Sequence, residues 1–158
     1  SLSGMSKVYG LAGLRIGWLA TRDAALYERM CRMRDYTTIC GPGPSEVLAL
    51  IGLRARDRIV AAHLERIRRN LALLDGFFKR RKDAFSWTRP RAGTIGLVRL
   101  RQEPDALAFC DRVVEKAGVM LLPSTVYEYG RSHLRLGFGR ENMPEALRRL
   151  EDFLGPAA

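Results

Sequence analysis

The stretch that decides the fold and the chemistry is SGMSKVYGLAGLRIG, residues 3–17. It places one lysine, Lys7, in a loop of glycines and small residues, and one arginine, Arg15, eight positions later. Glycines let the backbone of such a loop approach a ligand closely, and a partly desolvated lysine beside other cations becomes a usable amine nucleophile. The planar guanidinium of Arg15 suits a phosphate. The pair would therefore suit a phosphorylated aldehyde held through the lysine amine.

The composition is that of an ordinary globular protein. The chain has 158 residues, of which 47% are hydrophobic and 28% charged, so we do not expect disorder. No stretch approaches the ~18 apolar residues that a transmembrane helix needs, and the first twenty residues lack the order of a secretory signal. We therefore expect a cytoplasmic protein. The chain has no initiator methionine, so we also expect it to begin inside a longer reading frame.

Cysteine and histidine usage argues against disulfides and metals. The three cysteines, Cys31, Cys40 and Cys110, are widely spaced and form no CxxC pair, and only His63 and His133 could add nitrogen ligands. An odd number of cysteines at such spacing does not indicate a disulfide framework, and this ligand set does not indicate zinc. We expect a reducing compartment and no metal site.

The net charge is +10, from 27 Lys and Arg against 17 Asp and Glu. A charge of this size can favour nucleic acid. The cations are spread along the chain, however, and the one tight run, KRRK at residues 79–82, closes a predicted helix, where cations suit the helix dipole. We interpret that run as a solvated helix end and expect neither nucleic acid nor a membrane as a partner.

Residues 1–40 resemble the last pieces of a larger domain. A strand over 15–21 follows the glycine-rich loop, and a helix over 23–36 begins at the capping residue Asp23. Two glycines and two prolines within residues 40–45 then predict a constrained junction.

The longest predicted element is an amphipathic helix over residues 57–82, which follows a short helix over 45–53 capped by Ser45. Its apolar stripe steps by three and four residues and consists of Val60, Leu64, Ile67, Leu71, Leu74 and Phe78. We expect this helix to lie along or between domains.

Beyond the long helix, short strands alternate with helices, a pattern typical of a two-layer α/β domain. We expect strands over 85–87, 94–100, 119–122 and 133–138, and helices over 104–118 and 142–154. In the first of these helices the predicted stripe is Leu107, Cys110, Val114 and Ala117, with Gly118 as its end and Pro123 as the stop of the next strand.

Ser6 and Lys7, followed by YGLAGLRIGW at residues 9–18, closely resemble the lysine segment of class I and II aminotransferases, the fold-type I enzymes that use pyridoxal 5'-phosphate. The resemblance implies that Lys7 forms the Schiff base with this cofactor and acts as general acid and base, while Arg15 grips the cofactor phosphate. Many members carry serine or threonine three residues before the lysine. Gly4 stands there in this chain, so Ser6 becomes the candidate phosphate ligand, with Ser3 as a weaker one.

The resemblance extends over the whole chain. Residues 40–46 resemble the segment that links the large and small domains, and residues 92–94 the loop that opens the small-domain sheet. LLPSTVY at residues 121–127 resembles the segment often written LLPGSxF. HLRLGF at residues 133–138 matches the strand whose arginine, here Arg135, binds the substrate α-carboxylate, a role for which a bidentate guanidinium is suited.

The resemblance therefore implies the C-terminal portion of such an enzyme: residues 1–40 end the large cofactor-binding domain, 41–56 form the junction, and 57–158 form the α/β small domain. It implies amino-group transfer between an α-amino acid and a 2-oxo acid, in a homodimer. The family's other cofactor contacts precede the lysine and are not in this chain, so we expect the isolated chain to be inactive.

Two alternatives stay open. Related enzymes catalyse α-decarboxylation, β-elimination of C–S bonds or cyclisation, and a fold does not fix a reaction. Some bacterial transcription regulators join a DNA-binding helix-turn-helix to an aminotransferase-like domain, with which the basic charge is compatible. We interpret Tyr9, Tyr127 and His133 as packing residues in all of these cases.

Overall fold

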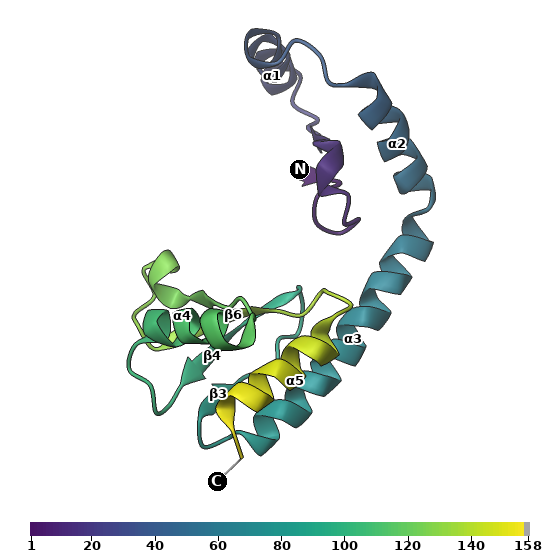
Figure 1. Ribbon diagram of the computed structural model, residues 1–158. Coiled ribbons are helices and arrows are strands. Elements are labelled where there is room, and N and C mark those ends of the chain that lie inside the picture. The colour runs from purple at the N-terminus through teal and green to yellow at the C-terminus, as the bar shows by residue number, and fades with distance from the viewer. Residues whose placement is uncertain (157–158) are drawn as a thin grey trace. The chain divides into compact units, whose positions relative to one another are not determined.

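The computed structural model describes residues 1–156, which form two compact units. The first unit runs from Ser1 to Ala62 and the second begins at His63. The boundary falls inside the longest helix, labelled α3 in Figure 1. The chain is a mixed α/β protein, as the alternation of predicted elements indicated.

The first unit opens with a two-stranded antiparallel hairpin, β1 (Leu2–Gly4) and β2 (Gly17–Leu19). The glycine-rich loop and a 3-10 turn over Ala12–Leu14 join the two strands. The predicted strand over 15–21 is thus shorter at both ends, and β1 was not predicted. Arg15 cannot belong to the strand, because it ends the 3-10 turn with a φ of 54° in the left-handed region.

Helix α1 (Ala24–Thr37) starts where the sequence predicts it. The side chain of Asp23 accepts a hydrogen bond from the Leu26 N–H at 3.0 Å, which confirms the predicted N-cap. No residue of α1 is buried, however, and Met33 is 62% exposed.

Helix α2 (Gly43–Arg54) begins two residues before its predicted cap. The expectation that Ser45 caps it is wrong, because Pro42 is the N-cap residue and its carbonyl accepts the Ser45 N–H at 2.9 Å. Pro44 lies in the first turn, where the N–H that proline lacks has no intrahelical partner to lose.

The second unit is built on a four-stranded antiparallel sheet of order β3-β4-β6-β5. The strands are β3 (Phe85–Trp87), β4 (Ile95–Leu100), β5 (Leu122–Pro123) and β6 (His133–Gly137), and the helices are α3 (Arg56–Arg80), α4 (Ala106–Ala117) and α5 (Met143–Leu154). A 3-10 turn, η2 (Ser124–Tyr127), follows β5. The core forms between one face of the sheet and these three helices.

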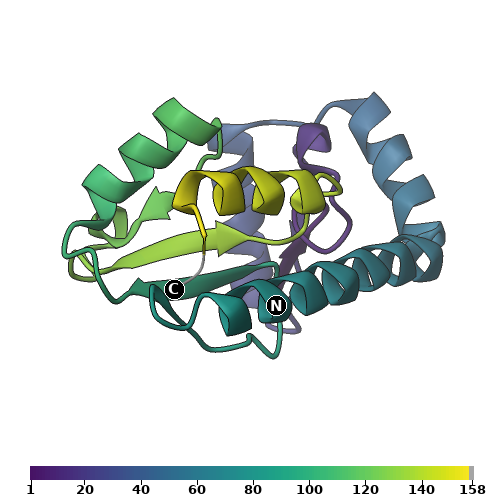
Figure 2. The same ribbon diagram turned by 60° about the horizontal axis from the view of Figure 1, so that its bottom comes forward.

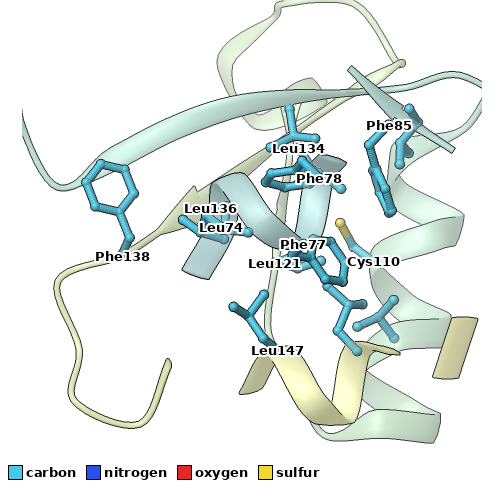
Figure 3. Close-up of a cluster of buried hydrophobic side chains, with 14 of the residues drawn as sticks. Leu74, Phe77, Phe78, Phe85, Cys110, Leu121, Leu134, Leu136, Phe138 and Leu147 are labelled. Carbon is cyan, nitrogen blue, oxygen red and sulfur yellow. The ribbon is translucent and has the colours of Figure 1, made fainter. Parts of the chain in front are cut away.

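Side chains alternate across the sheet, so that one face is buried and the other is not. Val98 of β4 and Leu134 and Leu136 of β6 point into the core, where Figure 3 shows Leu134 and Leu136 among side chains of α3 and α4. The helices contribute Leu71, Leu74, Phe77, Phe78, Phe109, Cys110, Val113, Leu147 and Leu150. The alternation leaves the half-buried His133 and Arg135 of β6 outside this core.

The stripe predicted for α4 is wrong in part. Leu107 and Val114 are 47% and 43% exposed, whereas Phe109 and Val113 are buried. Apolar residues occupy more than half of the circumference of this helix, so periodicity alone leaves two possible faces. The face that carries the aromatic ring is the one packed on the sheet, since Phe109 contacts Phe85 of β3 edge-on with 6.2 Å between the ring centroids.

Pro123 belongs to a strand instead of stopping one. It pairs with Leu134 as the second residue of β5. This strand lies at the edge of the sheet, where the N–H that proline lacks is not needed for pairing.

The basic run at residues 79–82 is only partly a solvated helix end. Arg80 forms an ion pair with Glu151 at 2.5 Å, and the buried Arg81 donates to the Gly155 carbonyl at 2.5 Å. Both contacts connect the end of α3 with the C-terminal end of α5, two elements that Figures 1 and 2 show in teal and yellow. Two of the four cations are therefore in contact with α5 or its cap and are not fully solvated. Within residues 1–156, no helix combines the length and the apolar character needed to cross a membrane.

Candidate functional site

The lysine loop is a compact turn with Lys7 at its exposed tip. The Gly10 N–H donates to the Lys7 carbonyl at 3.1 Å, and the Leu11 N–H donates to the Met5 carbonyl at 2.9 Å. The Met5 N–H continues the hairpin by donating to the Ile16 carbonyl at 3.0 Å. These bonds fix the backbone on both sides of Lys7 while its side chain stays exposed.

A buried methionine anchors this loop to α2. Met5 is fully buried, and a Cβ added at Gly52 would lie 2.9 Å from the Met5 Cε and 3.0 Å from the Leu11 Cδ1. The loop and the helix approach this closely because Gly52 has no side chain. Neither Met5 nor Gly52 was predicted as a site residue. A glycine within an apolar helix is the one sequence signal that could have pointed to this contact.

Close packing of the two hairpin strands explains why glycine stands at position 4. Gly4 pairs with Gly17 across the hairpin, and a Cβ at Gly4 would lie 3.1 Å from the Ile16 carbonyl oxygen and 3.2 Å from the Gly17 Cα. A serine or threonine there would be crowded by the backbone. Ser6 is half-buried beside Lys7, whereas Ser3 is exposed within β1. Of the two hydroxyls, Ser6 is the one carried by the lysine loop itself.

Arg15 adopts a strained backbone conformation at the end of the 3-10 turn. Its N–H and its Nη1 both donate to the Ala12 carbonyl at 3.3 Å. A residue other than glycine at positive φ costs of order 1 kcal/mol, and such strain concentrates at functional sites. Neither the Arg15 guanidinium nor the Lys7 amine has an acidic partner among residues 1–156. This loop therefore presents an amine and a guanidinium, both uncompensated, and this donor set fits a phosphorylated aldehyde.

The partial desolvation expected for Lys7 is not supplied by the first unit itself. The Lys7 side chain is exposed, and so are Val8 and Gly10 on the same turn. Any surface that excludes water from the lysine amine must therefore come from outside this unit.

Arg135 belongs to the second unit, so the structure groups Lys7, Ser6 and Arg15 in one loop and places Arg135 elsewhere in the chain. On β6 it lies between Leu97 of β4 and Leu122 of β5, and it lines a groove of about 570 Å³ beside α5. No carboxylate within the described part of the chain pairs with Arg135, so the structure offers no internal ion pair to explain it.

The partner of Arg135 is a tyrosine that sequence reasoning assigned to packing. Its Nη1 donates to the Tyr127 hydroxyl at 2.5 Å, and its guanidinium carbon lies 5.8 Å from the centroid of the same ring. The available signal was Tyr127 itself, which stands where the pattern LLPGSxF has phenylalanine. His133 does pack, with its ring edge-on to Tyr129 at 5.2 Å.

Ser124 joins the 3-10 turn to β6. It is fully buried; its hydroxyl donates to the Gly130 carbonyl at 3.0 Å and accepts from the His133 N–H at 3.2 Å. The turn that carries Tyr127 is therefore fixed to the strand that carries Arg135. Among residues 1–156, no group of three or more His, Cys, Asp and Glu side chains is placed to hold a metal ion.

Residues 1–150 match the family model described as Aminotransferase class I and II. Capreomycidine synthase of Streptomyces vinaceus is 27% identical over 160 residues, which cover 100% of this chain and 41% of that protein. A PLP-dependent aminotransferase from Streptococcus suis has a TM-score of 0.87 and 28% identity, covering 97% of this chain and 41% of its own. The PLP-dependent cyclase OrfR has a TM-score of 0.87 and 31% identity, covering 98% and 42%.

The chain thus spans about two fifths of the length of the proteins it matches. The family model, by contrast, covers nearly all of this chain, and it includes the lysine loop and β6 alike. The chain belongs to the class I and II aminotransferase family, whose members depend on pyridoxal phosphate.

Proposed function

We propose that this chain is the C-terminal portion of a pyridoxal-phosphate enzyme that moves an amino group between an α-amino acid and a 2-oxo acid. The observation that carries the proposal is the lysine loop, in which Lys7 and the strained Arg15 stand without acidic partners on a backbone anchored by Met5. The share of the relatives that the chain spans supports the assignment to a portion of a longer protein.

The domain assignment follows from the same proposal. Residues 1–40 would end the large cofactor-binding domain, 41–56 would form the junction, and 57–158 would form the small domain. The two-layer α/β architecture of the second unit supports its assignment as a separate domain. The parent enzyme would be a homodimer.

Pyridoxal phosphate supplies an aldehyde for amines and a ring that withdraws electrons from the carbon next to the amine nitrogen. The residues that would hold it are Lys7 through its amine, Arg15 through a forked contact to the phosphate, and Ser6 through its hydroxyl. Once its Nζ is free, Lys7 would accept the proton from the α-carbon of the substrate and return it, as a general base and acid must.

Arg135 would receive the α-carboxylate of the substrate. Its guanidinium has a tyrosine hydroxyl as partner and no carboxylate of its own within the described residues. A bidentate contact would fix the carboxylate and with it the direction of the α-hydrogen, which is the positioning that proton transfer requires.

We expect the isolated chain to be inactive even if it binds the cofactor. Lys7 is exposed, so the first unit alone does not enclose the position where the lysine amine would meet the cofactor and the substrate. The surface that would cover this loop would come from the rest of the longer protein.

Cyclisation of an amino acid is the second candidate reaction. The likeness to capreomycidine synthase and to the cyclase OrfR, at 27% and 31% identity, favours it specifically. Lys7, Arg15 and Arg135 would keep the same roles, since both reactions begin with a carboxylate held in place and a proton taken from the α-carbon. The two reactions differ in their product, which would be a 2-oxo acid after transamination and a ring-closed amino acid after cyclisation.

The test uses the full-length protein that contains this chain. With pyridoxal phosphate and borohydride, peptide mapping by mass should find one stable adduct at Lys7, absent in Lys7→Ala and retained in the control Lys116→Ala. A panel of amino acids is then supplied with 2-oxoglutarate, and products are identified by mass. A new 2-oxo acid supports transamination, and a ring-closed product supports cyclisation. An adduct elsewhere, or full turnover by Lys7→Ala, would contradict both candidates.

A further inference from the structure

Tyr127 and Arg135 interact in two ways, through a short hydrogen bond and through a contact between the guanidinium and the aromatic ring. Arg135 Nη1 donates to the Tyr127 hydroxyl at 2.5 Å, and the guanidinium carbon lies 5.8 Å from the ring centroid. One side chain thus offers Arg135 both a hydrogen-bond acceptor and the negative face of an aromatic ring. A long arginine side chain loses rotamer entropy when it is fixed, and this contact restricts the Arg135 side chain before any ligand arrives.

The backbone around Tyr127 is held in place independently of this contact. The buried Ser124 binds both Gly130 and His133, and the Tyr129 N–H donates to the Ser124 carbonyl at 3.1 Å. Leu122, just before the turn, pairs with Arg135 across the sheet. The backbone that carries Tyr127 is therefore held in place, and the tyrosine can orient the Arg135 guanidinium.

The contact with Tyr127 occupies one nitrogen of the Arg135 guanidinium and leaves the other two without a hydrogen-bond acceptor in the described chain. Nη1 is taken by the Tyr127 hydroxyl, whereas no residue of the described chain accepts a hydrogen bond from Nε or Nη2 of Arg135. Those two nitrogens form one edge of the fork, the geometry that grips a carboxylate with two parallel hydrogen bonds.

We propose that Tyr127 is a positioning residue, whose hydroxyl holds Arg135 so that its Nε–Nη2 edge faces the incoming α-carboxylate. The inference rests on the proposed role of Arg135 in substrate binding. The hydroxyl contributes beyond the ring, because the ring alone leaves the guanidinium free to rotate about its own axis. Tyr127 then sets the affinity for substrates that carry a carboxylate and leaves amines without one unaffected.

The experiment compares two probes on the full-length holoenzyme. One is 2-aminoisobutyrate, an amino acid without an α-hydrogen, and the other is isopropylamine, the same skeleton without the carboxylate. Their dissociation constants are measured by calorimetry in the wild type and in Tyr127→Phe, which keeps the ring. We expect Tyr127→Phe to weaken 2-aminoisobutyrate binding by about five- to tenfold, the size of one ordinary hydrogen bond, and to leave isopropylamine binding unchanged.

Kinetics give a second readout. For the best amino acid of the product panel, Tyr127→Phe should raise KM by a similar factor while kcat changes less than about twofold, since the lost contact acts on binding rather than on proton transfer. The matched control is Tyr129→Phe, a neighbouring exposed tyrosine that packs on His133 and has no contact with Arg135. It should leave KM and both dissociation constants unchanged.

Arg135→Lys separates this inference from the proposed function. If Arg135→Lys loses its preference for the carboxylate probe and Tyr127→Phe does not, the positioning role of Tyr127 is overturned and the role of Arg135 stands. If Arg135→Lys keeps that preference, the carboxylate role of Arg135 fails and the inference fails with it. Equal weakening of both probes in Tyr127→Phe would also overturn the inference, because it would indicate a general structural change.

Discussion

The two units of the chain differ most in how they bury apolar side chains. Every member of the large hydrophobic cluster lies between residues 71 and 150, in the second unit. Among the described residues of the first unit, only Met5 and Ala49 are buried apolar side chains, while Tyr36 is 89% exposed and Leu2 79%. The second unit thus has a core of its own, and the unit that carries the lysine loop does not.

The candidate site residues in the two units are therefore held in place by different interactions. Burial of apolar surface contributes roughly 25 cal/mol per Å², so the second unit can hold Arg135 and its turn in place without further contacts. The lysine loop depends instead on backbone hydrogen bonds of the hairpin and on the packing of Met5 and Leu11 against Gly52. Large exposed apolar surfaces mark sites where another surface binds. We therefore expect the order of the lysine loop to depend on contacts from outside the first unit.

The largest expected difference between the units is in thiol reactivity. Cys40 of the first unit is exposed, whereas Cys110 of the second is buried, and burial, with a smaller contribution from the charge of Asp111, raises the pKa of its thiol to about 11. At pH 8 a thiol reagent should modify Cys40 faster than Cys110 by about three orders of magnitude or more, because Cys110 reacts only after the core opens.

The rates are measured by quantifying labelled peptides by mass after quenching at increasing times. In denaturant the two rates should converge, which serves as the control. Similar rates without denaturant would show that the core of the second unit opens as readily as the first unit and would break the comparison.

Asn70 supplies the next largest effect, within the second unit. It is buried, and its amide donates to the carbonyls of Phe138 at 2.8 Å and Arg140 at 2.7 Å. Asn70→Ala leaves both carbonyls without this partner, so we expect the free energy of unfolding to fall by about 3 kcal/mol. Urea unfolding followed by circular dichroism measures it. The exposed control Gln102→Ala should change it by less than about 0.5 kcal/mol, the usual range for surface substitutions.

Replacing a closely packed glycine by alanine in each unit tests whether the two units differ in stability. A Cβ at Gly96 would lie 2.8 Å from Trp87 Cζ3, so Gly96→Ala should lower the main unfolding free energy by about 2 kcal/mol through overpacking. Gly52→Ala crowds Met5 instead, in the unit without a core. We expect it to leave the main transition in place and to speed hydrogen exchange at the Leu11 N–H, which closes the lysine loop.

Urea titrations and amide exchange measure the two effects. A gain in helix propensity of about 1 kcal/mol accompanies Gly52→Ala in α2 and limits its net effect. If both variants lowered the main transition equally, the two units would unfold together and the comparison would fail.

The smallest expected effect is a pH dependence in the second unit. The hydrogen bond from the Arg131 guanidinium, with that from the Ala108 N–H, lowers the pKa of Asp105, the N-cap of α4. Because the pKa is lowered in the folded state, the unfolded chain takes up this proton first as the pH falls. The contribution of Asp105 is therefore present at neutral pH and is lost as the pH falls through the folded pKa.

Urea midpoints measured from pH 7 to pH 3 report this loss. Asp105→Asn keeps a capping side chain but has no carboxyl to titrate, so its midpoint should vary less with pH than that of the wild type. Identical pH profiles for the two proteins would contradict the assigned cause.

The sequence by itself determined the features that depend on neighbouring residues. The 3.6-residue period predicted α3, the carboxylate of Asp23 predicted the start of α1, and alternation predicted β6. The resemblance of residues 6–18 to the lysine segment of class I and II aminotransferases indicated the family, which the match over residues 1–150 shows. Helical period, capping and motif spacing all act within about two turns of the chain, and a sequence displays them directly.

Only the tertiary structure decided which surfaces meet. It selected the buried face of α4, brought Gly52 against Met5, placed Arg81 on Gly155 and put the Tyr127 hydroxyl on Arg135. Periodicity defines the possible faces of a helix or strand, but the face that is buried depends on the surface that covers it. That surface comes from residues distant in the chain, and packing in three dimensions brings them together.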